Sequence, residues 1–191
     1  MSGVTIQIEP GSLAEVRALM TAYRNSSRKA IQRSINFGAK QGQKTGVDEM
    51  AKKANLTKKT IREHTKVYPT SISALSAKVV LKGEPISLIE YKARQTAKGV
   101  SFRIWKGQPL ERYRHAFIWT LIKERYTGVF EPNVDSPRFN GFGPYRRKSG
   151  PGVPTIYEKT PGLAGKVEQI AAEKMMGELK RQVGLIDRGF L

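Results

Sequence analysis

The stretch from residue 91 to residue 132 constrains the fold most, because its hydropathy alternates with the two-residue period of a β-strand. Val100, Phe102 and Ile104 fall on one face of such a strand and more polar residues on the other. Residues 115–122 are apolar on both faces, which predicts a central strand covered on both sides. We expect this stretch to form the hydrophobic centre of the protein.

Four other segments also have strand character. Residues 4–8 and 77–81 alternate, residues 86–89 follow a Gly-Glu-Pro turn, and residues 126–130 form a short run that contains a glycine. Together with the central stretch they predict an antiparallel sheet of about five strands.

The N-terminal part of the chain has the three- and four-residue spacing of an amphipathic helix. Apolar residues recur from residue 13 to residue 38 in an otherwise basic segment, so we expect a long helical arm. Gly42 and Gly46 are poor helix formers and should weaken its continuation. Asn55-Leu56-Thr57 then predicts the cap of a short basic helix over residues 58–64.

A second amphipathic helix is predicted at the C-terminal end. Thr160 is a capping residue, Pro161 suits the first helical position, and Gly184 suits the end. We expect this helix to pack on the sheet, which makes the fold class α+β. Residues 1–66 would form the N-terminal strand and helical arm and residues 67–191 the sheet and last helix, in one structural unit.

Charge is the strongest compositional feature. The chain has 34 Lys and Arg against 16 Asp and Glu, a net charge of +18, and no cysteine. Residues 24–66 and residues 91–149 each carry +9. Such concentrated positive charge attracts nucleic acid, and it also fits an acidic protein partner. The candidates on the helical arm are Arg24, Arg28, Arg33 and Lys40.

Residues 132–154 are rich in proline and glycine and predict a long loop. Its basic residues, Arg138, Arg146, Arg147 and Lys148, are further candidates to face nucleic acid. Phe139, Phe142 and Tyr145 lie between them, where they could stack on bases or contact a partner protein. A solvated loop without a partner has the same composition.

No motif predicts catalysis. The two histidines are far apart in the sequence, there is no G-x-S-x-G nucleophile motif, and no phosphate-binding glycine loop is present. No run is apolar enough to span a membrane. We therefore expect a protein that is not an enzyme, with no catalytic residue, metal or cofactor.

Several segments resemble, in order, the prophage minor tail protein Z family of tailed bacteriophages. Residues 86–102, ISLIEYKARQTAKGVSF, look like its Ile/Leu-rich segment running into an Ala-Arg-Gln-Thr-Lys-Gly-Val-like stretch. Ala116-Phe117-Ile118 and Gly128-Val129-Phe130 resemble its next two strands. Residues 150–157 resemble a Pro-rich segment that follows, and Arg28-Lys29-Ala30-Ile31 fits the basic N-terminal helix.

The resemblance covers most of the chain and implies a structural virion protein that completes the head-proximal end, or neck, of the tail. Copies would form a ring around the DNA channel and contact the tail terminator and connector proteins. Contact with packaged DNA would be non-specific and made through phosphates. The protein would reside in the virion, and in the host cytoplasm during assembly. The alternative from charge alone is a stand-alone, non-specific nucleic-acid-binding protein.

Overall fold

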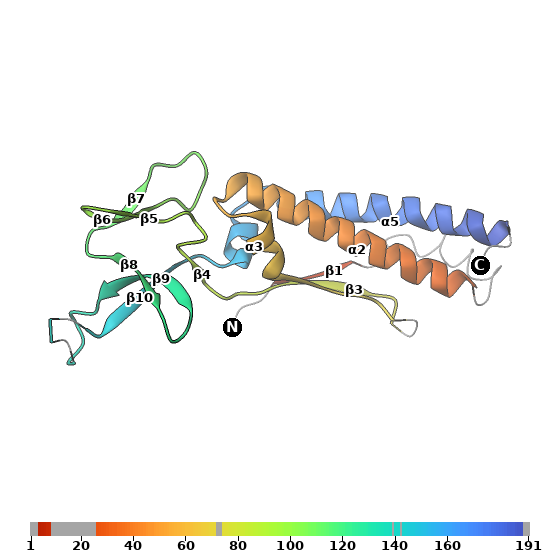
Figure 1. Cartoon of the computed structure of the whole chain (residues 1–191). Helices are drawn as coiled ribbons and strands as arrows, with labels where there is room; N and C mark the ends of the chain where they lie inside the picture. Colours follow the sequence, from red (N-terminus) through yellow and green to blue (C-terminus); the bar gives the residue numbers. More distant parts are fainter. Residues whose placement is uncertain (1–3, 9–25, 72–73, 139, 142, 189–191) are drawn as a thin grey trace.

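The computed structural model describes residues 4–8, 26–71, 74–138, 140–141 and 143–188. Figure 1 shows an elongated molecule, with two long helices at one end and short strands at the other. The elements in chain order are β1 (Val4–Ile8), α2 (Ser26–Lys53), α3 (Lys58–Glu63), β2 (Thr65–Tyr68), β3 (Ala77–Leu81), β4 (Ile86–Ser87), β5 (Arg94–Thr96), β6 (Gly99–Phe102), β7 (Glu111–Tyr113), β8 (Phe117–Leu121), β9 (Tyr126–Pro132), β10 (Tyr145–Gly150), α4 (Val153–Glu158) and α5 (Leu163–Asp187).

The helices α2 and α5 pack against each other in antiparallel directions (Figure 1). Helix α2 continues through Gly42 and Gly46 to Lys53, so the expected weakening does not occur. Val47 and Met50, which follow Gly46 on α2, are fully buried in the core, so tertiary packing outweighs poor helix propensity here. Earlier in the same helix a Cβ on Gly38 would come within 2.8 Å of Met175 Cβ, so glycine at position 38 lets α5 approach closely.

A three-stranded sheet in the order β1-β3-β2 covers one side of this helix pair. Alternation in β3 is as predicted: Ala77, Val79 and Leu81 are buried, whereas Lys78 is exposed. Ala77 and Val79 share a core cluster with residues of both helices. The expectation that the C-terminal helix packs on a sheet is therefore correct only in part, because its main partner is α2.

The antiparallel α+β character is confirmed, but the single sheet of about five strands is not. The strands at the other end form a three-stranded sheet, β5-β6-β7, and a four-stranded sheet, β4-β10-β9-β8. The predicted central strand is the edge strand β8, and Trp119 on it is 46% exposed. The two apolar faces of β8 differ in environment: one packs on the core, and the other, which carries Trp119, is exposed to solvent.

The predicted loop over residues 132–154 is also partly wrong. Residues Tyr145–Gly150 form β10, which pairs with β9 and then with β4, so the loop is limited to residues 133–144. The C-terminal helix begins at Leu163 after Gly162, whose φ of +69° suits glycine. Neither Thr160 nor Pro161 occupies its expected helical position, and Gly184 lies inside the helix. The short helix α3, capped by the Thr57 side chain, is as predicted.

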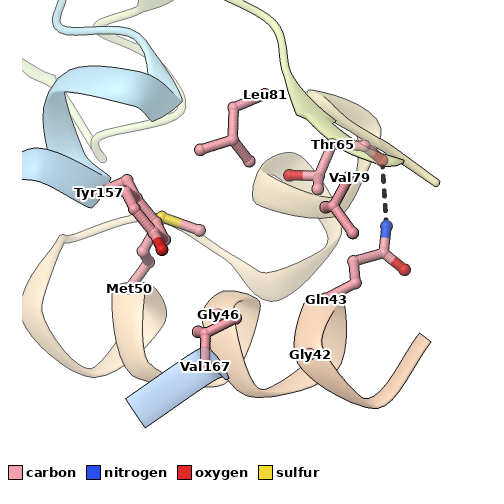
Figure 2. A pocket seen from close by; sticks show the side chains of 9 residues that line it. All are labelled: Gly42, Gln43, Gly46, Met50, Thr65, Val79, Leu81, Tyr157 and Val167. Atoms are coloured by element: carbon pink, nitrogen blue, oxygen red, sulfur yellow. Dashed lines mark hydrogen bonds between the residues drawn. The ribbon is translucent and has the colours of Figure 1, made fainter. Parts of the chain in front are cut away.

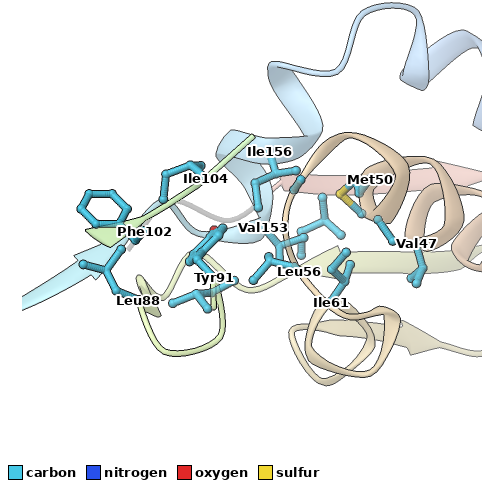
Figure 3. Packing of buried hydrophobic residues seen from close by; sticks show 14 of the residues in the cluster. Val47, Met50, Leu56, Ile61, Leu88, Tyr91, Phe102, Ile104, Val153 and Ile156 are labelled. Atoms are coloured by element: carbon cyan, nitrogen blue, oxygen red, sulfur yellow. The ribbon is translucent and has the colours of Figure 1, made fainter. Parts of the chain in front are cut away.

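One large core joins the helical end to the strands, and Tyr91 lies fully buried in it (Figure 3). The Tyr91 hydroxyl donates a hydrogen bond to the Pro151 carbonyl at 2.6 Å, and burial raises the pKa of this phenol well above its ordinary value. The Asn55 side-chain amide, just beyond α2, donates to the backbone carbonyls of Tyr91 and Arg103. These bonds fix the end of α2 against the β5-β6-β7 region.

Candidate nucleic-acid and partner interface

One face of the four-stranded sheet collects aromatic side chains, and we call it the aromatic face: Phe117, Trp119, Tyr126, Phe130 and Tyr145. In the antiparallel register Phe117 lies opposite Phe130, and Trp119 lies opposite Gly128. Residues directly opposite each other, and residues two apart in a strand, share a face of the sheet. The alternation of β8, β9 and β10 therefore puts all five rings on one side.

The rings contact each other mostly edge to face. The Trp119 and Tyr145 ring centroids are 5.7 Å apart at 86°, and those of Phe117 and Tyr145 are 5.3 Å apart at 85°. Trp119 also contacts Phe130 at 6.3 Å and 74°. Phe130 is buried beneath the others, whereas Trp119 and Tyr145 are 46% and 38% exposed. The cluster therefore combines a buried ring, Phe130, with two solvent-exposed rings, Trp119 and Tyr145.

A cation lies on the same face. The Arg147 guanidinium is 4.0 Å from the centroid of the Tyr126 ring, within range of a cation–π contact. The Tyr126 ring lies across Gly128, where a Cβ would come within 2.5 Å of the ring, and its hydroxyl hydrogen-bonds the Ser87 hydroxyl. The positions of β8, β9 and β10 on this face carry no Asp or Glu.

The opposite face of β10 carries Arg146 and Lys148, and both have anionic neighbours. Lys148 forms an ion pair with Glu131 and lies 5.0 Å from the Tyr113 ring centroid. Arg146 donates to Asn133 Oδ1 at 2.8 Å and lies 3.7 Å from the Asp135 carboxylate. The three basic residues of β10 are therefore divided between the two faces of the sheet. Arg147 lies on the aromatic face, and Arg146 and Lys148 lie on the opposite face.

The candidates on α2 form a separate group. Arg28, Arg33 and Lys40 are exposed on α2. The N-terminal end of this helix lies beside the C-terminal end of α5, far from β10 (Figure 1). Arg33 donates to Gln182 Oε1 at 3.3 Å. In the described part of the chain, Arg28 and Lys40 have no hydrogen-bond or ion-pair partner. The structure does not bring the α2 and β10 cations together.

Three of the predicted candidates, Arg24, Phe139 and Phe142, lie outside the described residues. Arg138 is exposed in the loop, and its backbone N–H donates to Ser136 Oγ. Tyr145 is the one predicted partner-contact residue that can be placed, and it lies on the aromatic face.

Sequence reasoning missed Phe117, Trp119 and Tyr126 as surface residues. It placed residues 115–122 in a covered strand because both faces are apolar. The available signal was the even spacing of the aromatic residues, two apart in Phe117-Ile118-Trp119 and four apart in Tyr126 and Phe130, on either side of Gly128. Spacing shows that these rings share a face, but it does not show whether another layer covers them.

The backbone of β8 forms an edge of the sheet. The Ile118 N–H points away from β9 and is bonded by the Gln95 side chain at 2.8 Å. A side chain that satisfies an edge N–H limits uncontrolled strand pairing.

Figure 2 shows a cavity between α2, the β1-β3-β2 sheet, α4 and α5. It has a volume of about 10 Å³, and its lining, which includes Met50, Val79, Leu81 and Val167, is mainly apolar. This space holds at most about one water molecule, so it is a packing defect and not a ligand site.

No three His, Cys, Asp or Glu residues in the described ranges are grouped so that they could hold a metal ion. None of the helices that can be described is long and apolar enough to cross a bilayer.

The comparisons with known proteins give no relatives. No family model matches the chain, and neither a curated protein nor a solved structure does.

Proposed function

We propose that this chain is a structural virion protein of a tailed bacteriophage, a tail-completion component at the head-proximal end of the tail. Copies of the chain assemble into a ring around the DNA channel and contact the tail terminator and connector proteins. The observation that carries the proposal is the ordered resemblance over residues 86–102, 116–118, 128–130 and 150–157.

The segments that carry the resemblance form strands and core residues of the protein. Residues 86–102 form β4, β5 and β6 and include the buried Tyr91. Residues 150–157 include the carbonyl that binds Tyr91 and the buried α4 residues Val153 and Ile156. A likeness in core-forming residues supports a shared architecture and a structural role.

The charge distribution supports contact with DNA inside such a channel. Arg28 and Lys40 have no partner among the residues that can be described, whereas Arg146 and Lys148 have nearby carboxylates. A cation without a carboxylate partner is available to neutralise a phosphate, and the DNA then releases the counterion condensed there. The exposed side of α2 is therefore the surface that we assign to the DNA backbone.

Duplex binding at several salt concentrations tests this assignment. Removing two phosphate contacts, by Arg28→Ala with Lys40→Ala, should lower the slope of log K against log salt by about 2. Arg146→Ala with Lys148→Ala, which removes two cations that have nearby carboxylates, is the matched control and should change the slope by less. Binding that ignores salt, or that differs by orders of magnitude between unrelated duplexes, would contradict phosphate-mediated contact.

Assembly can be tested separately. Like-charged subunits repel, and a head-to-tail contact closes a ring only when the rotation between neighbours allows it. We expect monomers or small oligomers at low salt in native mass spectrometry, and the protein in purified phage particles. The alternative, a stand-alone nucleic-acid-binding protein, is favoured by the charge of +18. It predicts DNA binding in solution and absence from particles.

A further inference from the structure

We propose that the aromatic face binds single-stranded nucleic acid, with unpaired bases stacking on Trp119 and Tyr145 and a phosphate contacting Arg147. This inference goes beyond the proposed function, which needs only phosphate contacts on α2. The inference concerns a different part of the molecule from α2, so an experiment can refute the inference or the proposed function without refuting the other.

The accessible rings provide the first argument. Trp119 and Tyr145 are the exposed members of the cluster, and Phe130 and Phe117 support them. Stacking of a base on an aromatic ring needs a ring that is held in place yet open to solvent. The backbone pairing of β8 with β9 places the supporting residues Phe117 and Phe130 opposite each other, so the rings have their packing partners before a ligand arrives.

The charge of the face provides the second argument. Arg147 is exposed and stands beside the rings, and no carboxylate shares the face of β8, β9 and β10 with it. Residues 111–150 carry eight Lys and Arg against four Asp and Glu, a net charge of +4. Two of those acids, Glu131 and Asp135, lie beside Lys148 and Arg146. A polyanion with exposed bases matches both the rings and the charge.

The same observations disfavour a second copy of this chain as the occupant. If two copies met through their aromatic faces, each would bring its exposed Arg147 and the net charge of +4 on residues 111–150 against the other. Duplex DNA is disfavoured as well, because paired and stacked bases offer no free ring surface to Trp119 and Tyr145. The proposed ligand is therefore a single strand.

Fluorescence of the full chain with an oligothymidine of about 20 nucleotides tests the proposal, since this length exceeds the usual site size of one binding fold. The chain has two tryptophans, so Trp105→Phe leaves Trp119 as the single reporter. We expect quenching of Trp119 as the oligonucleotide binds. An abasic strand of equal length keeps the phosphates and should bind more weakly without the same quenching.

Variants then measure the contribution of each ring by fluorescence anisotropy of the labelled oligonucleotide. Trp119→Ala and Tyr145→Ala should each weaken binding about 5- to 150-fold, as expected for one lost stack. Tyr68→Ala, which removes a 51% exposed ring from β2 in another sheet, is the control and should leave affinity unchanged. Trp119→Phe keeps a ring at the site and should retain most of the binding if the loss comes from stacking and not from misfolding.

Two results would overturn the proposal: equal affinity for the abasic and oligothymidine strands, and oligothymidine binding that Trp119→Ala leaves unaltered. If Trp119→Ala leaves that binding unaltered but changes the sedimentation of the protein, this face is a protein interface.

Discussion

The close contact between α2 and α5 gives a sharp prediction from two glycines on the same helix. A Cβ on Gly38 would lie 2.8 Å from Met175 Cβ and 2.9 Å from the Ala171 carbonyl oxygen. A Cβ on Gly46 would meet its nearest neighbour, Val167 Cγ2, at 3.7 Å, an ordinary contact. Replacing each glycine with alanine therefore separates helix propensity from helix packing.

Both substitutions gain about 1 kcal/mol because alanine is the better helix former. Gly38→Ala must also push α5 away, and overpacking of this kind costs about 1–3 kcal/mol. We expect Gly46→Ala to raise the free energy of unfolding by about 1 kcal/mol, and Gly38→Ala to leave it unchanged or lower it by up to about 2 kcal/mol. The difference between the variants, about 1–3 kcal/mol, is the packing cost alone.

Urea unfolding followed by circular dichroism measures these free energies, with equal slopes for the variants as the check on comparability. Gly177→Ala on the exposed side of α5, where a Cβ meets nothing within 4 Å, reports the propensity term by itself. If Gly38→Ala stabilised the protein as much as Gly46→Ala, the close approach of the two helices would be refuted.

Two further predictions concern buried or paired side chains. The hydrogen bond from Arg181 lowers the pKa of Glu178 to about 2, from an ordinary value of 4.5. Since the folded pKa lies below the unfolded one, this carboxylate stabilises the fold above about pH 4.5 and the effect is lost as the pH falls toward 2. Glu178→Gln should therefore flatten the dependence of unfolding free energy on pH in that window, and an unchanged profile would contradict the pairing. Tyr91→Phe leaves the Pro151 carbonyl without its donor and should cost about 1–3 kcal/mol in urea unfolding; a neutral substitution would show that this hydrogen bond is unimportant.

The sequence predicted the elements whose pattern is local. The strand β3, the short helix α3 with its Thr57 cap and the strand β9 all follow from alternation or capping chemistry. Both long helices follow from apolar residues at helical spacing, although their ends do not.

Features that depend on distant partners were not predictable in this way. β10 contains Arg146, Arg147 and Lys148 and has no apolar alternation, yet it pairs with β9. Across this pairing Lys148 forms an ion pair with Glu131, and Arg147 lies over the Tyr126 ring. Gly42 and Gly46 are poor helix formers, yet α2 continues through both to Lys53, because tertiary packing outweighs helix propensity. The aromatic face of β8 looks like a core because a period of two does not show whether another layer covers the strand.

The central claim, a ring-forming component at the head-proximal end of a phage tail, is tested most directly by reconstruction of the purified particle by electron cryomicroscopy. The account predicts a closed ring of this chain around the channel axis, between tail and connector, with the exposed side of α2 toward the DNA. Density for this chain at the distal tip, or as a single copy away from the axis, would contradict it.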